Sequence, residues 1–421
     1  MGWNDQYKRY IESKYEYIDL NREVQIGGTV RTIDFDKLKR IRELGSGARG
    51  TTYLVEFEGV QYAQKIQHIL EEELVEDYGN EIWREMDLYR YIDQMSDDDQ
   101  IFFTHLHAYR IYNGCTYVQN KRLYNDANIL KAKFDAIAAS DWCITYLMDY
   151  KGINTLATFS RTPTDMNLNT ACSFALQMCK IIDILYIGGY SHNDFFPGNI
   201  MVSRTKVGYF EFMGHHVPYN GYQLTAIDYG FVIHKKFLNN VKPTDPNYGF
   251  FVDPERWCFR ETFQRVLMIF ERMSKIMNLY KKPTEDTSRG KNSFSVDHAI
   301  RQILIRHPDF YKMVRGKYVE KFPKGKKLLD EVVHQIKTKG KNRIHDFVQK
   351  KSIIGSDDAA SFRDILERIV EEFKISFPKK YAEYRNWDDW DENIVPKDTM
   401  LKLLRITDRN RMINFLIDLM V

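Results

Sequence analysis

HNDFFPGN at residues 192–199 and IDYG at residues 227–230 are the two stretches that decide the fold. The first stretch places Asp194 ahead of Asn199, and an apolar run follows it directly. A carboxylate can accept a hydroxyl proton, and aspartate and asparagine oxygens are the hard ligands that Mg²⁺ prefers. Such a segment, followed by a second aspartate in Ile-Asp-Tyr-Gly, rarely arises by chance. We therefore expect Asp194 to act as a base and Asn199 and Asp228 to hold magnesium.

GSGARG at residues 45–50 lies upstream of these segments, and Lys65 follows it one hairpin further along the chain. Glycines without a Cβ let backbone amides fold close over phosphate groups. A glycine-rich hairpin also occurs for structural reasons, so this pattern by itself is a weak signal. Together with the two acidic segments it indicates a phosphate-binding loop made of Gly45, Ser46, Gly47, Ala48, Arg49 and Gly50.

Lys65 ends the strand segment Tyr-Ala-Gln-Lys, from which its ammonium group can reach bound phosphates. Without the neighbouring motifs it would be read as a solvated strand lysine. A lysine in a buried site needs a carboxylate partner from the next helix to hold it extended. Glu85 is the expected partner because apolar residues follow it at helical spacing, and Glu81, one turn earlier on nearly the same face, is the alternative.

These motifs occur in the order glycine-rich loop, strand lysine, catalytic loop and metal aspartate, and over about residues 40–275 the chain resembles the protein-kinase superfamily. The resemblance implies transfer of the γ-phosphoryl group of ATP, with Mg, to a Ser or Thr hydroxyl of a protein substrate. It implies that Asp194 and Lys65 are catalytic. It also implies that Met148, Asp149 and Tyr150 join two lobes and meet adenine. In its Tyr-, Asn- and Ile-rich style the chain is also similar to kinases of large cytoplasmic DNA viruses.

Several positions depart from the common kinase pattern. Asn193 replaces the arginine that receives a phosphorylated activation loop in many kinases, and Phe196 replaces a lysine common in Ser/Thr kinases. Residues 203–222 form an insertion. Asp253-Pro254-Glu255 is either the Ala-Pro-Glu equivalent or the start of the next core helix. Two alternatives therefore stay open: a small-molecule kinase of the same fold, and a pseudokinase-like scaffold, although all four chemical positions hold competent residues.

The pattern of apolar residues predicts an α+β fold, and the resemblance implies that it is a two-lobed protein-kinase-like fold. Residues 1–38 are expected to be an N-terminal extension, 39–150 a small antiparallel β lobe with one helix, 151–280 a larger helical lobe, and 281–421 a helical C-terminal extension. In the small lobe we expect hairpins over 38–69, a helix around 70–94, and strands near 101–112 and 142–150. A buried helix over 168–187 should stop at Gly188-Gly189. Further helices are expected near 255–280, 296–315, 326–350, 358–376 and 397–420.

Charge is unevenly distributed along the chain. The formal net charge is +3, yet residues 281–351 carry 19 Lys or Arg against 8 Asp or Glu. This basic stretch is a candidate docking surface for an anionic partner. No nucleic-acid motif accompanies it.

The five cysteines are scattered and form no Cys-x-x-Cys pair. Their spacing predicts reduced thiols, not a disulfide framework or a zinc site. The N-terminal segment is too polar for a signal peptide. No apolar run is expected to span a membrane, because even 168–187 carries Lys180 and Asp183. We expect a cytoplasmic protein.

Overall fold

The structure is a computed structural model. It describes residues 18–19, 23–26, 29–46, 50–78, 80–115, 136, 139–159, 166–236, 254–281, 303, 306–319, 334, 369–370, 372–373, 376–377, 380 and 390–420. The chain divides into two compact units. The first unit comprises residues 1–156, 194–203 and 225–232, and the second unit comprises residues 157–193, 204–224 and 233–421. The fold is α+β, as predicted.

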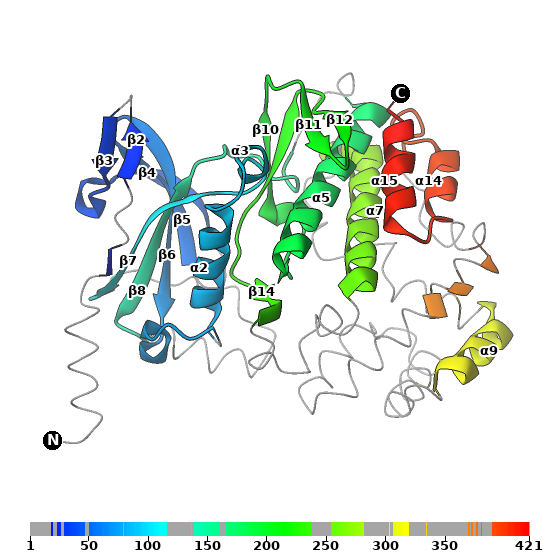
Figure 1. The fold of residues 1–421 in the computed structure, drawn as a ribbon, viewed down its shortest axis with the longest axis horizontal. Helices are drawn as coiled ribbons and strands as arrows, with labels where there is room; N and C mark the ends of the chain where they lie inside the picture. The colour runs from blue at the N-terminus through cyan, green and yellow to red at the C-terminus, as the bar shows by residue number, and fades with distance from the viewer. Residues whose placement is uncertain are drawn as a thin grey trace. The chain divides into compact units, whose positions relative to one another are not determined.

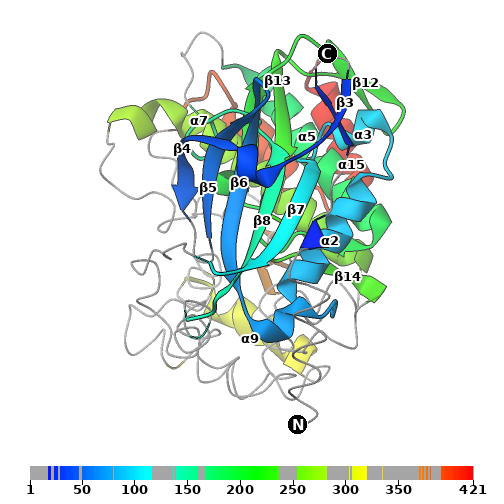
Figure 2. The same ribbon diagram turned by 90° about the vertical axis from the view of Figure 1, so that its left-hand side faces the viewer.

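The first unit contains a six-stranded antiparallel sheet, in which the strand order is β1-β7-β8-β6-β5-β4. Figure 2 shows β4, β5, β6, β8 and β7 side by side. The hairpins predicted over 38–69 are confirmed, because β5 pairs antiparallel with both β4 and β6. β1 is a strand that the sequence did not predict; it pairs with β7. The strands are β1 (Ile18–Asp19), β4 (Lys39–Ser46), β5 (Gly50–Phe57), β6 (Val60–Ile69), β7 (Leu106–Asn113) and β8 (Trp142–Asp149).

The helix α2 (Glu81–Ile92) belongs to the same unit and buries Ile82, Met86 and Tyr89. The predicted helix over 70–94 was too long. Its first part is a short 3₁₀ turn, η2 (Glu71–Leu74), in which the Glu73 carboxylate accepts a hydrogen bond from the Leu70 N–H. Asn80 is extended and precedes the first helical residue, so the regular helix begins only there. Smaller elements are β2 (Glu23–Ile26), β3 (Thr29–Thr32), η1 (Phe35–Lys37) and α3 (Asp97–Gln100).

The second unit is built on α5 (Leu168–Gly188) and α7 (Pro254–Lys281), which contact each other and α15 (Arg409–Asp418) (Figure 1). The Asn167 side chain caps α5 by accepting from the Thr170 N–H at 2.9 Å. The predicted stop is confirmed, because Gly189 has a left-handed φ of 82°. Among the helices described, α5 alone is long and apolar enough to cross a membrane. Most of its apolar window is buried inside the protein, as in a core helix, so it gives no clear transmembrane segment.

The insertion predicted at 203–222 contains a hairpin of β11 (Tyr209–Phe212) and β12 (His215–Pro218). The single helix predicted over 397–420 is instead two, α14 (Lys397–Leu403) and α15. The break has a local cause, since the Asp408 carboxylate accepts from the Arg411 N–H and starts a new helix. The remaining elements are η5 (Pro197–Asn199), α9 (Pro308–Val319) and the strands β9 (Tyr190–Ser191), β10 (Ile200–Arg204), β13 (Tyr222–Ala226) and β14 (Ile233–His234).

Some predictions fall on other parts of the chain. The helix predicted over 296–315 is in its described part helical at Ile303 and Arg306, and again in α9, which begins at Pro308. The helix over 326–350 lies outside the described residues except for His334, which is helical. Most of the helix over 358–376 and most of the basic stretch 281–351 also lie outside them. Asp253 lies outside them too, whereas Pro254 is the first residue of α7, where proline is well tolerated.

The prediction of five reduced thiols was wrong. Cys115 and Cys143 form a disulfide, and Cys172, Cys179 and Cys258 are free and buried. The two bonded cysteines are far apart in sequence, but the pairing of β7 with β8 places Tyr112 beside Cys143. Spacing along the chain could not show this proximity, because it depends on the register of two strands.

Candidate active site

Lys65 lies at the centre of the candidate site, in the middle of β6, where it is paired with Thr52 of β5 and Tyr146 of β8. Its Nζ atom is 2.9 Å from Oδ1 of Asp228 and 3.4 Å from Oε1 of Glu85. The three side chains differ in exposure: Lys65 is 15% exposed and Glu85 2%, whereas Asp228 is 48% exposed. One buried and one open carboxylate thus share a single ammonium group.

The environment of Lys65 keeps it charged. Burial by itself lowers the pKa of Lys65, but the nearby carboxylates of Asp228 and Glu85 outweigh burial and raise that pKa well above its ordinary value. Glu85, not Glu81, supplies the carboxylate next to Lys65, because Glu85 lies on the buried side of α2 whereas Glu81 is only half-buried at its first position. The spacing of apolar residues in the sequence had also favoured Glu85 over Glu81.

Asp228 has a positive φ of 60°, which is uncommon outside glycine. The residue that follows explains how this backbone is held. Tyr229 is fully buried, and its hydroxyl donates to the Ala226 carbonyl at 2.7 Å and accepts from the Thr104 N–H at 2.9 Å. With Tyr229 fixed in the core, the preceding carboxylate is left at the surface beside Lys65.

The segment after Asp228 is also tied to α2. The Tyr229 ring packs edge to face on Tyr89, with centroids 5.1 Å apart. The Arg84 side chain donates to the Val232 carbonyl at 3.1 Å. Helix α2 therefore holds this segment on both sides of Gly230, in addition to supplying Glu85.

Asn199, itself a predicted magnesium ligand, connects the predicted base Asp194 to the segment that carries the other predicted ligand, Asp228. Its side-chain amide donates at 2.9 Å to the backbone carbonyl of Asp194 and at 2.9 Å to the Asp194 carboxylate. The backbone carbonyl of Asn199 accepts a hydrogen bond from the Ile227 N–H at 3.0 Å, and Ile227 directly precedes Asp228. The tight turn through 194–199 and the 227–230 segment are thereby joined within the first unit.

The residues present fit a magnesium ion by their chemistry. Because the nitrogen of the Asn199 amide donates to Asp194, its oxygen is the atom that remains to ligate a cation. Asp228 adds a half-exposed carboxylate. These are the hard oxygen ligands that Mg²⁺ takes, and such sites commonly use one or two protein groups together with water and phosphate oxygens.

The segment Met148-Asp149-Tyr150 ends β8 and is held mainly by side chains. The Tyr89 hydroxyl donates to the Met148 sulfur at 3.0 Å, and Met148 is buried. The Asp149 carboxylate bonds to His107 at 2.7 Å and Lys151 at 3.0 Å. The Asp149 N–H donates to the backbone carbonyl of His105, just before β7, so this amide already has a partner within the first unit. The Tyr150 hydroxyl lies 3.5 Å from the Arg42 guanidinium.

The glycine-rich loop connects β4 to β5. Gly45 and Ser46 end β4 and Gly50 begins β5, while Gly47, Ala48 and Arg49 lie outside the described residues. A Cβ at Gly50 would meet the Ile66 carbonyl oxygen at 2.3 Å, whereas a Cβ at Gly45 would meet nothing within 4 Å. Gly50 is therefore required by strand packing, but Gly45 is not.

Tyr229, Tyr89 and Arg84 were missed by reading the sequence. The tyrosine after Asp228 was a usable signal, because a large aromatic beside a polar site residue needs a buried place for its ring and a partner for its hydroxyl. No sequence pattern could identify Tyr89 as the contact, since the helix face depends on how α2 packs. No protein-family model matches this chain, and no curated protein matches it significantly.

Proposed function

We propose that this protein is an ATP-dependent phosphotransferase with a two-lobed protein-kinase-like fold, which transfers the γ-phosphoryl group of ATP to a Ser or Thr hydroxyl of a protein. The observation that carries the proposal is the placement of Lys65 between the buried Glu85 and the half-exposed Asp228. A charged lysine that is held rigidly by one carboxylate, beside a second carboxylate open to a metal ion, suits a site for a metal–nucleotide complex.

Each residue has a distinct role in this proposal. Lys65 binds phosphate oxygens, and Glu85 keeps its side chain extended and protonated. Asn199 and Asp228 hold the magnesium ion, which when bound neutralises phosphate charge. Asp194 accepts the proton of the acceptor hydroxyl, and its hydrogen bond from Asn199 fixes the orientation of the carboxylate. Gly45, Ser46 and Gly50 frame the loop proposed to lie over the phosphates.

The ion-pair observation also weighs against the scaffold alternative. Burying Lys65 and Glu85 is costly unless the two charges are well paired, and an apolar pair of the same size is often as stable. A buried, charged lysine directed at a half-exposed carboxylate is therefore better explained by ligand binding than by stability.

The test is phosphoryl transfer from labelled ATP to casein by full-length protein, compared with Lys65→Met and Glu85→Gln. Both substitutions should lower turnover by a factor of about a hundred or more, because positioned charge typically contributes that much. Glu81→Gln is the matched control, one turn earlier on the same helix, and should keep near wild-type activity. Wild-type turnover by Lys65→Met would refute the proposal.

One observation favours the small-molecule kinase as a second candidate. Phe196, two residues after the proposed base, is 44% exposed and stands where many Ser/Thr kinases have lysine. An open aromatic side chain beside Asp194 would suit an apolar or ring-shaped acceptor. Incubation with labelled ATP, first alone and then with protein acceptors, distinguishes the two, since label in this chain or in casein supports the protein kinase.

A further inference from the structure

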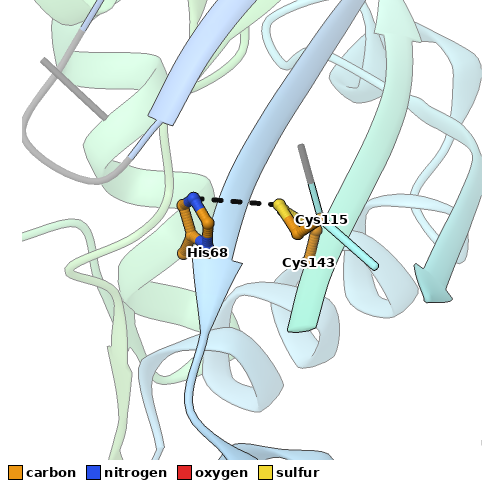
Figure 3. A group of neighbouring side chains, drawn as sticks. All are labelled: His68, Cys115 and Cys143. Atoms are coloured by element: carbon orange, nitrogen blue, oxygen red, sulfur yellow. Dashed lines mark hydrogen bonds between the residues drawn. A yellow bond between two sulfur atoms is a disulfide. The ribbon is translucent and has the colours of Figure 1, made fainter. Parts of the chain in front are cut away.

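His68, Cys115 and Cys143 meet at one end of the sheet of the first unit, where His68 and Cys143 lie on strands and Cys115 lies just beyond one (Figure 3). His68 of β6 and Cys143 of β8 are direct register partners. Cys115 follows the end of β7, which pairs with the other side of β8. The left-handed Gly114, with φ 79°, turns the chain there, and the Cys115 N–H donates to the Asp141 carbonyl at 3.0 Å. The fold itself therefore brings the three side chains together.

The ring of His68 is oriented as a ligand would be. Nδ1 lies 3.0 Å from the Ser140 carbonyl oxygen, and Nε2 lies 3.8 Å from the Cys115 sulfur. A backbone carbonyl only accepts, so Nδ1 must carry the proton. In the neutral ring Nε2 then presents its lone pair to the sulfur. Metal-binding histidines are commonly fixed in this way, with the second ring nitrogen donating to a backbone carbonyl.

The distances and burial suit a metal ion. The three ligand atoms lie within 4.8 Å of one another. In a tetrahedral zinc site, with bonds of about 2.0–2.3 Å, neighbouring ligand atoms are about 3.6 Å apart, close to the 3.8 Å between His68 and Cys115. His68 and Cys143 are buried, whereas Cys115 is half-buried and gives access from solvent. Within the part of the chain that the structure describes, this is the one such group of His, Cys, Asp or Glu side chains.

We propose that, once the disulfide is reduced, His68, Cys115 and Cys143 bind one zinc ion, so that the two sulfurs alternate between a disulfide and a zinc dithiolate. A dithiol reductant supplies two electrons and two protons, breaks the S–S bond to give two thiols, and is itself oxidised to a disulfide. Zinc then displaces the two thiol protons and binds both thiolates and Nε2 of His68. Water takes the fourth position. In the reverse direction a disulfide oxidant accepts two electrons from the thiolates and two protons from water to become two thiols, while the S–S bond of Cys115 and Cys143 re-forms and the zinc ion is released.

Zinc is the expected ion because two thiolates and one imidazole form a soft N/S ligand set. The site does not depend on the phosphotransfer activity. It does share β6 and β8 with Lys65, whose register partner in β8 is three residues beyond Cys143. A change at the cluster would therefore act on strands that also carry the candidate active site.

The experiment uses the full chain, reduced with a phosphine and desalted without oxygen, and titrated with zinc against a chromogenic chelator. We expect one zinc per reduced chain and none per oxidised chain. Cys115→Ser and His68→Asn should each weaken zinc binding by at least about tenfold, the scale set by changes around metal ligands. Cys258→Ser removes a buried cysteine of the second unit and is the matched control, expected to bind as the wild type does.

Cobalt substitution supplies a readout that needs no variant. Thiolate ligation should give the reduced wild type a sulfur-to-cobalt charge-transfer band, which oxidation removes. Absence of that band in the folded, reduced wild type would overturn the proposal, even if a variant failed to fold. Zinc binding undiminished in Cys115→Ser would overturn it as well, since the ion would then lie elsewhere.

Discussion

The ring of Tyr229 meets the ring of Tyr89 edge to face, with centroids 5.1 Å apart. Tyr229 directly follows Asp228, and Tyr89 lies one turn after Glu85 on α2, so this contact joins the two segments whose carboxylates flank Lys65. The segments are thus connected twice, by an apolar contact in the core and by an ion pair nearer the surface. A displacement of α2 would disturb both connections together.

Tyr229→Phe should keep the ring contact with Tyr89 but remove the hydroxyl. The Thr104 N–H and the Ala226 carbonyl would keep the hydrogen bond that they make to each other at 3.1 Å, but each would lose its bond to the hydroxyl, and such a bond typically contributes about 0.5–1.5 kcal/mol to the unfolding free energy. We expect a matching loss in urea denaturation and weaker metal-dependent binding at Asp228. Tyr209→Phe, at an exposed tyrosine of the second unit, is the control and should change stability little. Equal stability of Tyr229→Phe and wild type would show that the two bonds do not hold the segment.

Asp194→Asn and Asp228→Asn should separate base chemistry from metal binding. Asp194→Asn removes the proton acceptor, so turnover should fall by a factor of about a hundred or more while stabilisation by ATP and magnesium persists. Asp228→Asn should instead reduce the magnesium-dependent part of the thermal shift, because it removes a charged oxygen ligand. Melting temperature with nucleotide, with and without magnesium, measures the difference. The assignment fails if the two variants show the same profile.

Gly50→Ala should lower the stability of the fold, whereas Gly45→Ala should leave that stability nearly unchanged. Gly50→Ala forces a Cβ against the Ile66 carbonyl, so strands β5 and β6 must shift and stability should fall by roughly 1–3 kcal/mol, as for other overpacked sites. Gly45→Ala meets open space and should leave the melting temperature of the free protein nearly unchanged. Any loss of ATP affinity in Gly45→Ala then reports on the loop and not on the fold. A strongly destabilised Gly45→Ala would contradict this reading.

The sequence predicted the strands and helices well where periodicity was strong, as in the hairpins over 38–69 and in α5, which stops at Gly189 as expected. It also predicted Lys65 and Glu85 as partners, because the spacing of apolar residues marked the buried side of α2.

Features that depend on register or packing could not be predicted in this way. The disulfide between Cys115 and Cys143 and the contact of Tyr89 with Tyr229 join residues far apart in the chain. The break between α14 and α15 could have been predicted, because residues 407–411 are all polar and include the capping aspartate, Asp408.

Asp149 gives the fold a pH dependence of predictable sign. Burial by itself raises the pKa of Asp149, but the hydrogen bond from His107 and the charge of Lys151 outweigh burial and hold that pKa well below its usual range. A carboxyl group whose pKa is depressed in the folded state stabilises the protein above its unfolded pKa, which is about 3.9. That contribution is lost progressively as the pH falls below this value toward the folded pKa.

Asp149→Asn should therefore lower the unfolding free energy by about 1.5–3 kcal/mol at neutral pH, the range for hydrogen bonds to charged groups. The difference from wild type should shrink at about pH 3, because part of the wild-type advantage is lost below the unfolded pKa of about 3.9. Urea denaturation at both pH values measures this convergence. Asp141→Asn, at an exposed aspartate just before the same strand, is the control and should run parallel to wild type. A difference between Asp149→Asn and wild type that stays constant with pH would mean that Asp149 stabilises the end of β8 by its shape and hydrogen bonds, and not by its charge.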